Sequence, residues 1–476
     1  MGMTDMGPAL LQKLRDIVGD EAVTTNVTDM APYLEERRGL YVGKAAAIVR
    51  PGSTAEVAAV MKLAHATDTI VVPQGGNTGL VGGQTPDQSG EAIVLNLSRM
   101  NSVRTIDTQN NTLSVDAGVT LAAAQDAAAA TDRLFPLSLA SEGTCQIGGN
   151  LATNAGGTAV LHYGNARDLV LGLEIVLADG RIWDGMRSLR KDNTGYDLKQ
   201  LFLGSEGTLG IITGAVLKLF PAPKSKATAL AAVPGPAEAV SLLRHIETDS
   251  GGAITSFELM PRIGIEMVTK HVPGTRDPLT TPSPWYVLAE LSSGSEGAHV
   301  KALLEASLAA AMEKDWVSDA AVAQSDTQAA AFWQLREAMS DAQRHEGGSI
   351  KHDVSVPISN ITLFLERALQ AVHAELPNIR PVPFGHLGDG NIHFNLSQPI
   401  GMDTDAFLKQ WTHFNHLVHG IALGLGGSIS AEHGIGQLKR DEMAALKSDV
   451  ELDLMRTLKR TLDPKGILNP GKVVSV

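Results

Sequence analysis

The spacing of hydrophobic residues in the first half of the chain predicts helices and short strands in alternation. Between residues 53 and 68, apolar side chains recur every three or four positions behind a capping box of Ser53 and Glu56, which is typical of an amphipathic helix. An alanine-rich run at 120–131 also predicts a helix. Strands are predicted at 69–73, 92–97, 113–115 and 211–219, and a hairpin at 173–184 with a primed turn at Asp179 and Gly180.

The second half mixes helical and extended patterns in a different order. The segment FPAPKSK at 220–226 places two prolines among lysines, which indicates a domain boundary near residue 222. Helices that follow separate strands favour an α+β class. We expect domains at 1–222 and 223–430, and a C-terminal segment at 431–476 that completes the active site. Helices are predicted at 236–248, 297–314, 327–343, 360–374, 404–423 and 440–462, and strands at 285–291 and 391–397.

Composition and charge exclude several classes of protein. Of 476 residues, 43% are hydrophobic and 19% are charged, which excludes global disorder. No apolar run approaches the roughly 20 residues that a transmembrane segment needs, and the polar start of the chain does not read as a secretory signal. A net charge of −13 argues against nucleic acid as a partner, because neutralising phosphates needs a surplus of Lys and Arg. The single cysteine, Cys145, excludes an intrachain disulfide and fits a cytoplasmic location.

Glycine is concentrated in loops that follow predicted strands. Residues 73–80 read PQGGNTGL, and residues 141–157 form a longer stretch of glycine and small polar residues. Successive backbone N–H groups in such loops can bind an anion, and glycine lets the chain approach a phosphate closely. The chain has neither the Walker lysine nor a GxGxxG motif, so a P-loop and a Rossmann fingerprint are both excluded. Taken alone, the first loop could equally be a structural turn.

These loops, together with GSEGTLGIIT at 204–213, resemble the FAD domain of the vanillyl-alcohol oxidase/p-cresol methylhydroxylase superfamily over residues 40–222. The resemblance implies a two-part FAD-binding domain, an α+β substrate domain with an antiparallel sheet, and a C-terminal helical segment. Some members attach the flavin through a histidine in the first loop; because this chain has Asn77 there, we expect non-covalent FAD. The residues implied to bind FAD are Pro73, Gln74, Gly75, Gly76, Asn77, Thr78, Gly79, Gly143, Thr144, Gly148, Asn150, Thr153, Asn154, Gly157, Gly207 and Ile212.

Histidines gather in two motifs of the second half. In GHLGDGNIHFN, the strand alternation after the Asp-Gly turn places His393 and Asn395 on one polar side, and the turn can return His386 to the same place. The motif ISAEHGIG adds Glu432 and His433. Two histidines and a carboxylate form a common ligand set for Zn²⁺ or a similar divalent ion. Any one of these histidines could instead be a hydrogen-bonded structural residue, and the absence of HExxH speaks against zincin-type hydrolysis.

Both motifs resemble the metal-dependent D-2-hydroxyacid dehydrogenases of the same superfamily, most closely the D-2-hydroxyglutarate dehydrogenases and next the D-lactate dehydrogenases. The segments WQLRE at 333–337 and KHDVSVP at 351–357 match as well. The resemblance implies FAD- and metal-dependent oxidation of a D-2-hydroxy acid to the 2-keto acid by hydride transfer to the flavin. It assigns the metal, expected to be zinc, to His386, His393 and Glu432, the catalytic base to His433, and the substrate to Arg336, Ser340, Lys351 and Asn395.

Two departures and one alternative concern the substrate residues. The family often has Thr where Ser340 stands and an aromatic residue where His352 stands, which leaves the surroundings of Lys351 open. Arg336 and Ser340 are four apart on a predicted helix and so share a face. Spacing alone would equally allow Arg336 to be an exposed charge paired with a neighbouring acid.

Three other functions stay open on sequence grounds. The substrate could be D-lactate or another D-2-hydroxy acid; the protein could be a flavin-free metallohydrolase; or it could be a non-catalytic subunit. The expected partners are a small D-2-hydroxy acid and an electron acceptor such as electron-transfer flavoprotein or a quinone, and a homodimer is left open. No CxxC-type iron–sulfur segment is present, so electrons would leave the flavin directly to that acceptor.

Overall fold

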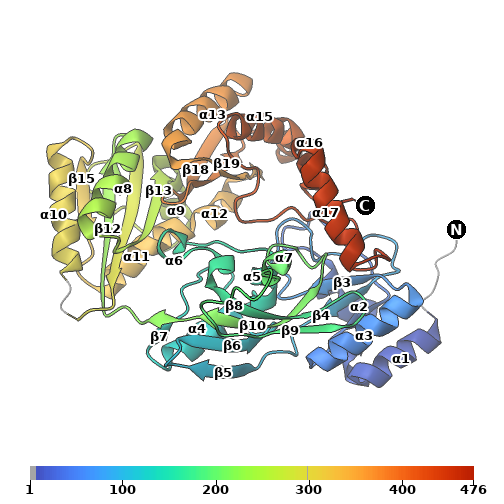
Figure 1. Ribbon diagram of the computed structural model, residues 1–476. Helices are drawn as coiled ribbons and strands as arrows, with labels where there is room; N and C mark the ends of the chain where they lie inside the picture. The colour runs from blue at the N-terminus through green and yellow to red at the C-terminus, as the bar shows by residue number, and fades with distance from the viewer. Residues whose placement is uncertain (1–6, 297–298, 476) are drawn as a thin grey trace. The chain divides into compact units, whose positions relative to one another are not determined.

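The computed structural model describes residues 7–296 and 299–475, which divide into two compact units (Figure 1). Of the described residues, unit 1 contains 7–156, 165–222 and 432–475, and unit 2 contains 157–164, 223–296 and 299–431. No helix among the described residues is both long enough and apolar enough to cross a membrane.

Unit 1 contains two sheets. In the four-stranded sheet, the three strands β2, β4 and β3 run parallel and β1 is antiparallel to β2. The strands across this sheet are β1 (Val23–Thr24), β2 (Ala47–Val49), β4 (Ile93–Asn96) and β3 (Val71–Gln74). The five-stranded antiparallel sheet has the order β5 (Val103–Asp107), β6 (Thr112–Asp116), β10 (Ile211–Lys218), β8 (Val170–Val176) and β9 (Ile182–Gly185).

Short helices and one further strand pair complete unit 1. Strands β7 (Arg133–Leu134) and β11 (Phe220–Pro221) pair with each other. The α-helices are α1 (Pro8–Val18), α2 (Val27–Leu34), α3 (Thr54–Thr67), α4 (Leu121–Ala129), α5 (Ile147–Ala152), α7 (Lys199–Phe202), α16 (Arg440–Leu446) and α17 (Asp449–Leu462), with 3-10 turns η1 (Asp20–Ala22) and η2 (Ala166–Leu169).

The helix predicted at 53–68 is confirmed as α3. The Ser53 hydroxyl accepts a hydrogen bond from the backbone N–H of Glu56 at 3.2 Å and so caps the helix. The side chain of Glu56 in turn accepts the N–H of Gly52 at 2.8 Å. The apolar positions that predicted the helix, Val57, Val60, Met61 and Ala64, are its buried residues.

The hairpin predicted at 173–184 is present as β8 and β9, but its turn is not a primed one. Gly180 has φ +84°, whereas Asp179 is not among the residues with positive φ. The N–H of Gly180 donates to the carbonyl of Leu177, so the loop is a common turn followed by a glycine in the left-handed region. The Asp-Gly pair predicted the position of the turn but not its type.

Unit 2 is built around an eight-stranded antiparallel sheet in its described residues. Its strands are β15 (Asp319–Val322), β12 (Ser225–Val233), β14 (Trp285–Ser293), β13 (Ile254–Pro261), β18 (Arg380–His386), β19 (Asn391–Ser397) and β16 (Ser349–Ile350), with β17 (Asp353–Ser355) also pairing with β19. Its helices are α6 (Val160–Tyr163), α8 (Pro236–Ser250), α9 (Arg262–His271), α10 (Val300–Glu313), α11 (Asp326–Glu337), α12 (Met339–Ala342), α13 (Ile361–Glu375), α14 (Thr404–Leu408) and α15 (Trp411–Gly424), with η3 (Gln343–Glu346) and η4 (Ile358–Asn360).

Each face of this sheet packs against a hydrophobic core. On β12, Ala229 and Ala231 belong to a first hydrophobic core, which includes residues of α8, α10, α13 and α15. Leu230 and Ala232 belong to a second core on the other face, which includes residues of α9, α11 and α12. Figure 1 shows α8 and α10 beside β12. On β19, Ile392 and Phe394 belong to the first of these cores. The alternation therefore turns His393 and Asn395 toward the side of the sheet that carries α11 and α12.

Three of the long helices predicted in the second half are broken. The helix predicted at 327–343 bends at Ala338, where ψ is −9°, and continues as α12 and η3. The one predicted at 404–423 is divided into α14 and α15, and the one at 440–462 into α16 and α17. Extended backbone at Lys447 and Ser448 makes the last break, and Ser448 with Glu451 forms a capping box that starts α17.

The helices predicted at 236–248, 297–314 and 360–374 lie close to their predicted bounds as α8, α10 and α13, whereas α9 was not predicted. The helix predicted at 297–314 is α10, which begins at Val300; residues 297–298 lie outside the described residues. Strands β12, β13, β15 and β18 were not predicted. Strand β12 consists largely of alanines, which have weak strand propensity, and both of its faces are buried, so it has no polar alternation.

Candidate active site

A cavity of about 310 Å³ in unit 1 is lined by the glycine-rich segments. Residues 73–79 at the end of β3 form part of its wall, together with residues from within 146–156 and 206–212. Glu432 and His433, at the start of the last segment of unit 1, also line it.

The first glycine loop is pinned from behind. Gln74 is buried, and its side-chain amide donates to the carbonyl of Tyr33 at 2.8 Å while its oxygen accepts from Asn96 at 3.1 Å. Asn77, with φ +53°, donates through its side chain to the carbonyls of Pro32 and Glu35, both at 2.9 Å. The Asn77 side chain therefore fastens the loop to the residues around α2.

The backbone N–H groups of this loop have no hydrogen-bond acceptor among the described residues. Within the described chain, the N–H groups of residues 75–79 donate no hydrogen bond. A Cβ at Gly76 would overlap the carbonyl oxygen of Thr144, so only glycine allows this close approach of two loops. Consecutive unsatisfied N–H groups facing a cavity make an anion-binding site, which fits a pyrophosphate.

Not all of the residues predicted to bind FAD line this cavity. Thr144 instead backs the first loop, and Asn154 caps the backbone N–H of Arg167 at 2.9 Å through its side chain. Gly143 is absent from the wall and Gly157 belongs to unit 2. The predicted residues that line the cavity are Pro73, Gln74, Gly75, Gly76, Asn77, Thr78, Gly79, Gly148, Asn150, Thr153, Gly207 and Ile212. The lining residues that sequence reasoning missed include Arg37, Gln84, Gln146 and Glu206.

Glu206, in the GSEGTLGIIT segment at 204–213, binds the C-terminal segment of unit 1. Its two carboxylate oxygens accept the backbone N–H groups of Ile435 and Gly436 at 2.7 and 2.8 Å. Burial raises the pKa of Glu206, and these two hydrogen bonds oppose that rise. All of these residues belong to unit 1.

In unit 2, a fully buried carboxylate joins two of the predicted site residues. Glu258 on β13 accepts a hydrogen bond from Arg336 Nε at 2.6 Å and from His386 Nδ1 at 2.7 Å. Burial alone would raise the pKa of Glu258, but the charges and hydrogen bonds of His386 and Arg336 lower it to about 2. The open alternative for Arg336 is therefore wrong: the side chain is only 7% exposed and is paired with Glu258.

The contact with Glu258 also orients His386. Because Nδ1 donates to the carboxylate, Nε2 is the atom that can bind a metal. One ring nitrogen of His386 lies within 4.8 Å of one of His393, and their ring centroids are 5.5 Å apart. The turn between β18 and β19 thus brings the two histidines together, as their spacing predicted.

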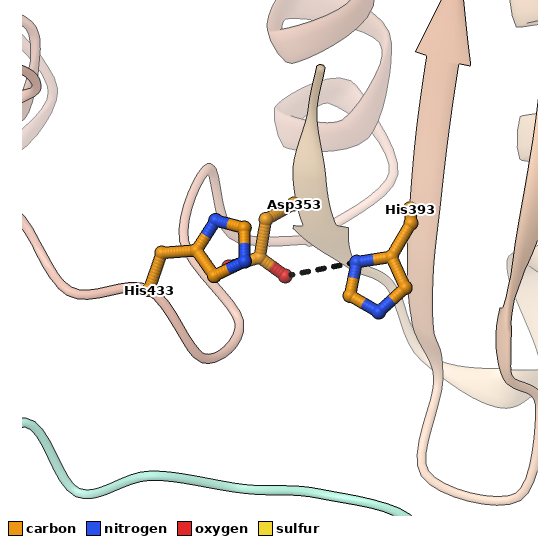
Figure 2. A group of neighbouring side chains, drawn as sticks. All are labelled: Asp353, His393 and His433. Carbon is orange, nitrogen blue, oxygen red and sulfur yellow. Dashed lines mark ion pairs between the residues drawn. The ribbon is translucent and has the colours of Figure 1, made fainter. Parts of the chain in front are cut away.

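A second carboxylate lies beside His393. Figure 2 shows Asp353, on β17, pointing toward His393 on the neighbouring β19, with 3.8 Å between Oδ1 and Nδ1. Asp353 is buried and accepts the side-chain N–H of Asn391 at 3.0 Å. Sequence reasoning missed Asp353, although it stands in the KHDVSVP segment.

The remaining predicted substrate residues form two hydrogen-bonded pairs. Lys351 Nζ donates a hydrogen bond to Ser340 Oγ at 2.7 Å. Ser340 stands where the family often has threonine, and its hydroxyl accepts this bond. Asn395 donates to Gln343 at 3.0 Å, and both side chains are buried. Val382, which pairs with Asn395 on the neighbouring strand β18, belongs to the core that contains residues of α11 and α12.

His352 and Cys145 are both buried among core residues. The His352 ring is buried, lies 2.6 Å from the carbonyl oxygen of Phe394 and packs against His419. It therefore fills part of the core in the way that an aromatic residue would. Cys145 is 1% exposed and burial raises the pKa of its thiol, which fits a small core residue.

Comparison with known proteins identifies the family. Residues 222–473 match the family described as FAD linked oxidases, C-terminal domain, and residues 45–185 match the FAD binding domain. The chain belongs to the FAD-linked oxidases. It is a flavoenzyme that binds FAD, and the flavin-free reading is therefore wrong.

Two relatives are similar over nearly the whole chain. The D-2-hydroxyglutarate dehydrogenase of Xanthomonas citri pv. viticola is 37% identical over 99% of this chain and 97% of its own length. A mitochondrial protein of Schizosaccharomyces pombe that carries a D-lactate dehydrogenase name is 36% identical over 95% of this chain and 86% of its own.

A solved structure supports the fold. The crystal structure of p-cresol methylhydroxylase with substrate bound has a TM-score of 0.76, covers 98% of this chain and 96% of its own, and is 17% identical. The two-part FAD-binding architecture predicted from the resemblance is confirmed.

Proposed function

We propose that this FAD-linked oxidase oxidises a D-2-hydroxy acid to its 2-keto acid, with D-2-hydroxyglutarate as the preferred substrate. The observation that carries the proposal is the buried set Glu258, Arg336 and His386, in which one carboxylate holds a guanidinium and an imidazole side by side. An arginine suits a substrate carboxylate, and a histidine held through Nδ1 suits a metal that binds a hydroxyl. The Xanthomonas citri relative supports the choice of substrate.

FAD fits the cavity of unit 1. The unpartnered N–H groups of residues 75–79 would hold its pyrophosphate, and Gly207 and Ile212 would lie along the rest of the cofactor. Asn77 offers an amide, which forms no covalent link to a flavin, so we infer non-covalent binding. When bound, the flavin accepts the hydride that leaves C2 of the substrate.

We further propose that His386, His393 and Glu432 hold a divalent cation, expected to be Zn²⁺. The donor set fits, because His386 carries the carboxylate partner that zinc-bound histidines usually have. When bound, such a cation lowers the pKa of a coordinated hydroxyl.

The remaining residues bind the substrate and move one proton. Arg336 and Lys351 would hold carboxylate charge, Ser340 positions Lys351, and Asn395 would donate to a polar group of the substrate. His433 would remove the proton of the C2 hydroxyl, because an imidazole nitrogen can act as a general base. Its place in the wall of the flavin cavity supports this role.

One alternative substrate is favoured by a specific observation. The Schizosaccharomyces pombe relative carries a D-lactate dehydrogenase name, so D-lactate is the second candidate. D-Lactate has no second carboxylate, and a pocket built with both Arg336 and Lys351 would bind it less tightly. Comparing the two acids as reductants of the bound flavin separates the candidates.

Metal dependence is tested by removing the metal. We expect a chelator to suppress turnover and added Zn²⁺ to restore it, while FAD content stays unchanged. Full activity in protein shown to be metal-free would overturn the ligand assignment but would leave the flavin chemistry intact. The electron acceptor, a homodimer and a cytoplasmic location stay predictions.

A further inference from the structure

The Glu206 side chain, from a different part of unit 1, binds the loop that carries Glu432 and His433. Glu206 comes from the GSEGTLG motif, 229 positions before Ile435 in the sequence. Its carboxylate accepts the N–H of Ile435 through Oε1 and that of Gly436 through Oε2. Each oxygen thus binds a separate backbone group of the loop.

The backbone around this carboxylate is shaped to receive it. Gly434 has φ +82° and Gly436 has φ +51°, conformations that allow successive N–H groups to converge on one anion. A Cβ at Gly434 would lie 2.8 Å from Glu206 Oε1, and one at Gly83 would lie 3.2 Å from Oε2. Glycines therefore surround the carboxylate where any side chain would displace it.

Glu206 itself adopts a left-handed backbone conformation, which glycine tolerates best and which glutamate adopts rarely. Its φ is +52°, between Gly204 at +77° and Gly207 at +69°. Glycine would adopt this φ without strain. The presence of glutamate here therefore indicates that its side chain has a role. The backbone is tied down independently, because the Asn469 side chain donates to the Glu206 carbonyl at 2.8 Å.

We infer that Glu206 is a positioning residue, which holds His433 and Glu432 at the flavin cavity by anchoring Ile435 and Gly436 further along their loop. Glu206, Glu432 and His433 all line that cavity. His433 lies two residues before Ile435, so we expect the loss of these two hydrogen bonds to loosen the backbone that carries His433. The inference rests on the proposed function only where His433 is the base; the anchoring itself does not depend on it.

The test uses the full-length flavoprotein and Glu206→Gln. The amide has the shape of the carboxylate, but its NH₂ group would face one of the two N–H donors. We expect hydrogen exchange at the amides of Ile435 and Gly436 to become at least about tenfold faster, the factor that corresponds to losing one charge-assisted hydrogen bond. FAD content should stay at the wild-type level. With D-2-hydroxyglutarate, kcat should fall by at least about tenfold and KM should stay unchanged, because Glu206 would not touch the substrate.

The matched control is Glu174→Gln. Glu174 lies on β8 in the same unit and does not line the cavity; its carboxylate accepts from Arg104 at 2.8 Å and from Thr213 at 2.9 Å. We expect this variant to keep wild-type exchange at Ile435 and wild-type flavin reduction. If Glu206→Gln fails to fold, Glu206→Asp, which keeps the charge but retracts it by one methylene, carries the same test.

Each outcome decides a different part of the inference. Unchanged exchange at Ile435 and Gly436 in Glu206→Gln would overturn the anchor. Faster exchange with wild-type kcat would overturn the positioning role, and loss of FAD together with kcat would reduce Glu206 to a purely structural residue. If the wild-type flavin is reduced by neither hydroxy acid, the proposed function fails, while the exchange measurement still decides the anchor.

Discussion

Glu258→Gln should weaken the metal site and the fold together. The carboxylate of Glu258 is fully buried and accepts hydrogen bonds of 2.6 Å from Arg336 and 2.7 Å from His386. Glutamine has the same shape but only one accepting oxygen, and its NH₂ group would face the N–H of either Arg336 or His386. One of those two side chains must therefore lose its partner.

The magnitude follows from burial. Arg336 is 7% exposed, so removing its counter-charge leaves a guanidinium without a partner in the interior. We expect unfolding to become about 3 kcal/mol easier, the lower end of the range for breaking a buried ion pair, because one hydrogen bond is kept. Loss of the acceptor for His386 Nδ1 should weaken metal binding about 10- to 100-fold.

Two measurements check this prediction against a control. Denaturant unfolding reports the stability loss, and competition with a chelator reports the affinity for Zn²⁺. The control, Glu290→Gln, changes a carboxylate of the same sheet that accepts only from neutral groups, Thr228 and Trp333, both at 3.0 Å. It should cost about 1 kcal/mol or less and leave metal affinity unchanged. Wild-type stability and metal affinity in Glu258→Gln would refute the reasoning.

Three further predictions follow from single sites. His433→Ala should slow flavin reduction by about 10²- to 10⁴-fold while FAD stays bound, and reduction at the wild-type rate would remove His433 from the role of base. Glu346→Gln should remove about 1–3 kcal/mol at neutral pH and much less near pH 2, because hydrogen bonds from Lys270 and the other cations around the carboxylate lower the pKa of Glu346 from 4.5 to about 2. The stabilisation from the ionised Glu346 is complete above its ordinary pKa of 4.5 and is lost as the pH falls through its folded pKa of about 2. Urea titrations of the wild type and the variant check this, and an undiminished difference in unfolding free energy near pH 2 would contradict it. Gly76→Ala should lower FAD occupancy, measured by flavin absorbance, because the Cβ would overlap the carbonyl of Thr144.

The local sequence pattern predicted those elements whose caps and buried faces are encoded within the element itself. The helix α3 was predicted with its cap and its buried face, because both are encoded within residues 53–68. The breaks at Ala338 and Lys447 were not, since apolar periodicity continues across them. The second break had a readable signal in the Ser448–Glu451 capping box. Strand β12 was missed because burial on both faces leaves no alternation to detect.

The candidate site divides in the same way. His386 and His393 could be placed together from the sequence, because a tight turn joins their strands. Glu258 could not, because its partners Arg336 and His386 lie 78 and 128 positions away. It stands in an apolar strand without a motif, so only the order of strands in the sheet brings it to them. Glu206 stands within the glycine-rich motif at 204–210, and its contact with the C-terminal loop likewise depends on the fold.

The most direct test of the proposed reaction is anaerobic reduction of the bound flavin by substrate. D-2-Hydroxyglutarate is added to one sample of the purified protein and D-lactate to another, and the flavin absorbance is followed over time. We predict fast bleaching by D-2-hydroxyglutarate and slow bleaching by D-lactate. The reverse order would make the protein a D-lactate dehydrogenase, and a yellow protein bleached by neither acid would contradict the assignment to D-2-hydroxy acids.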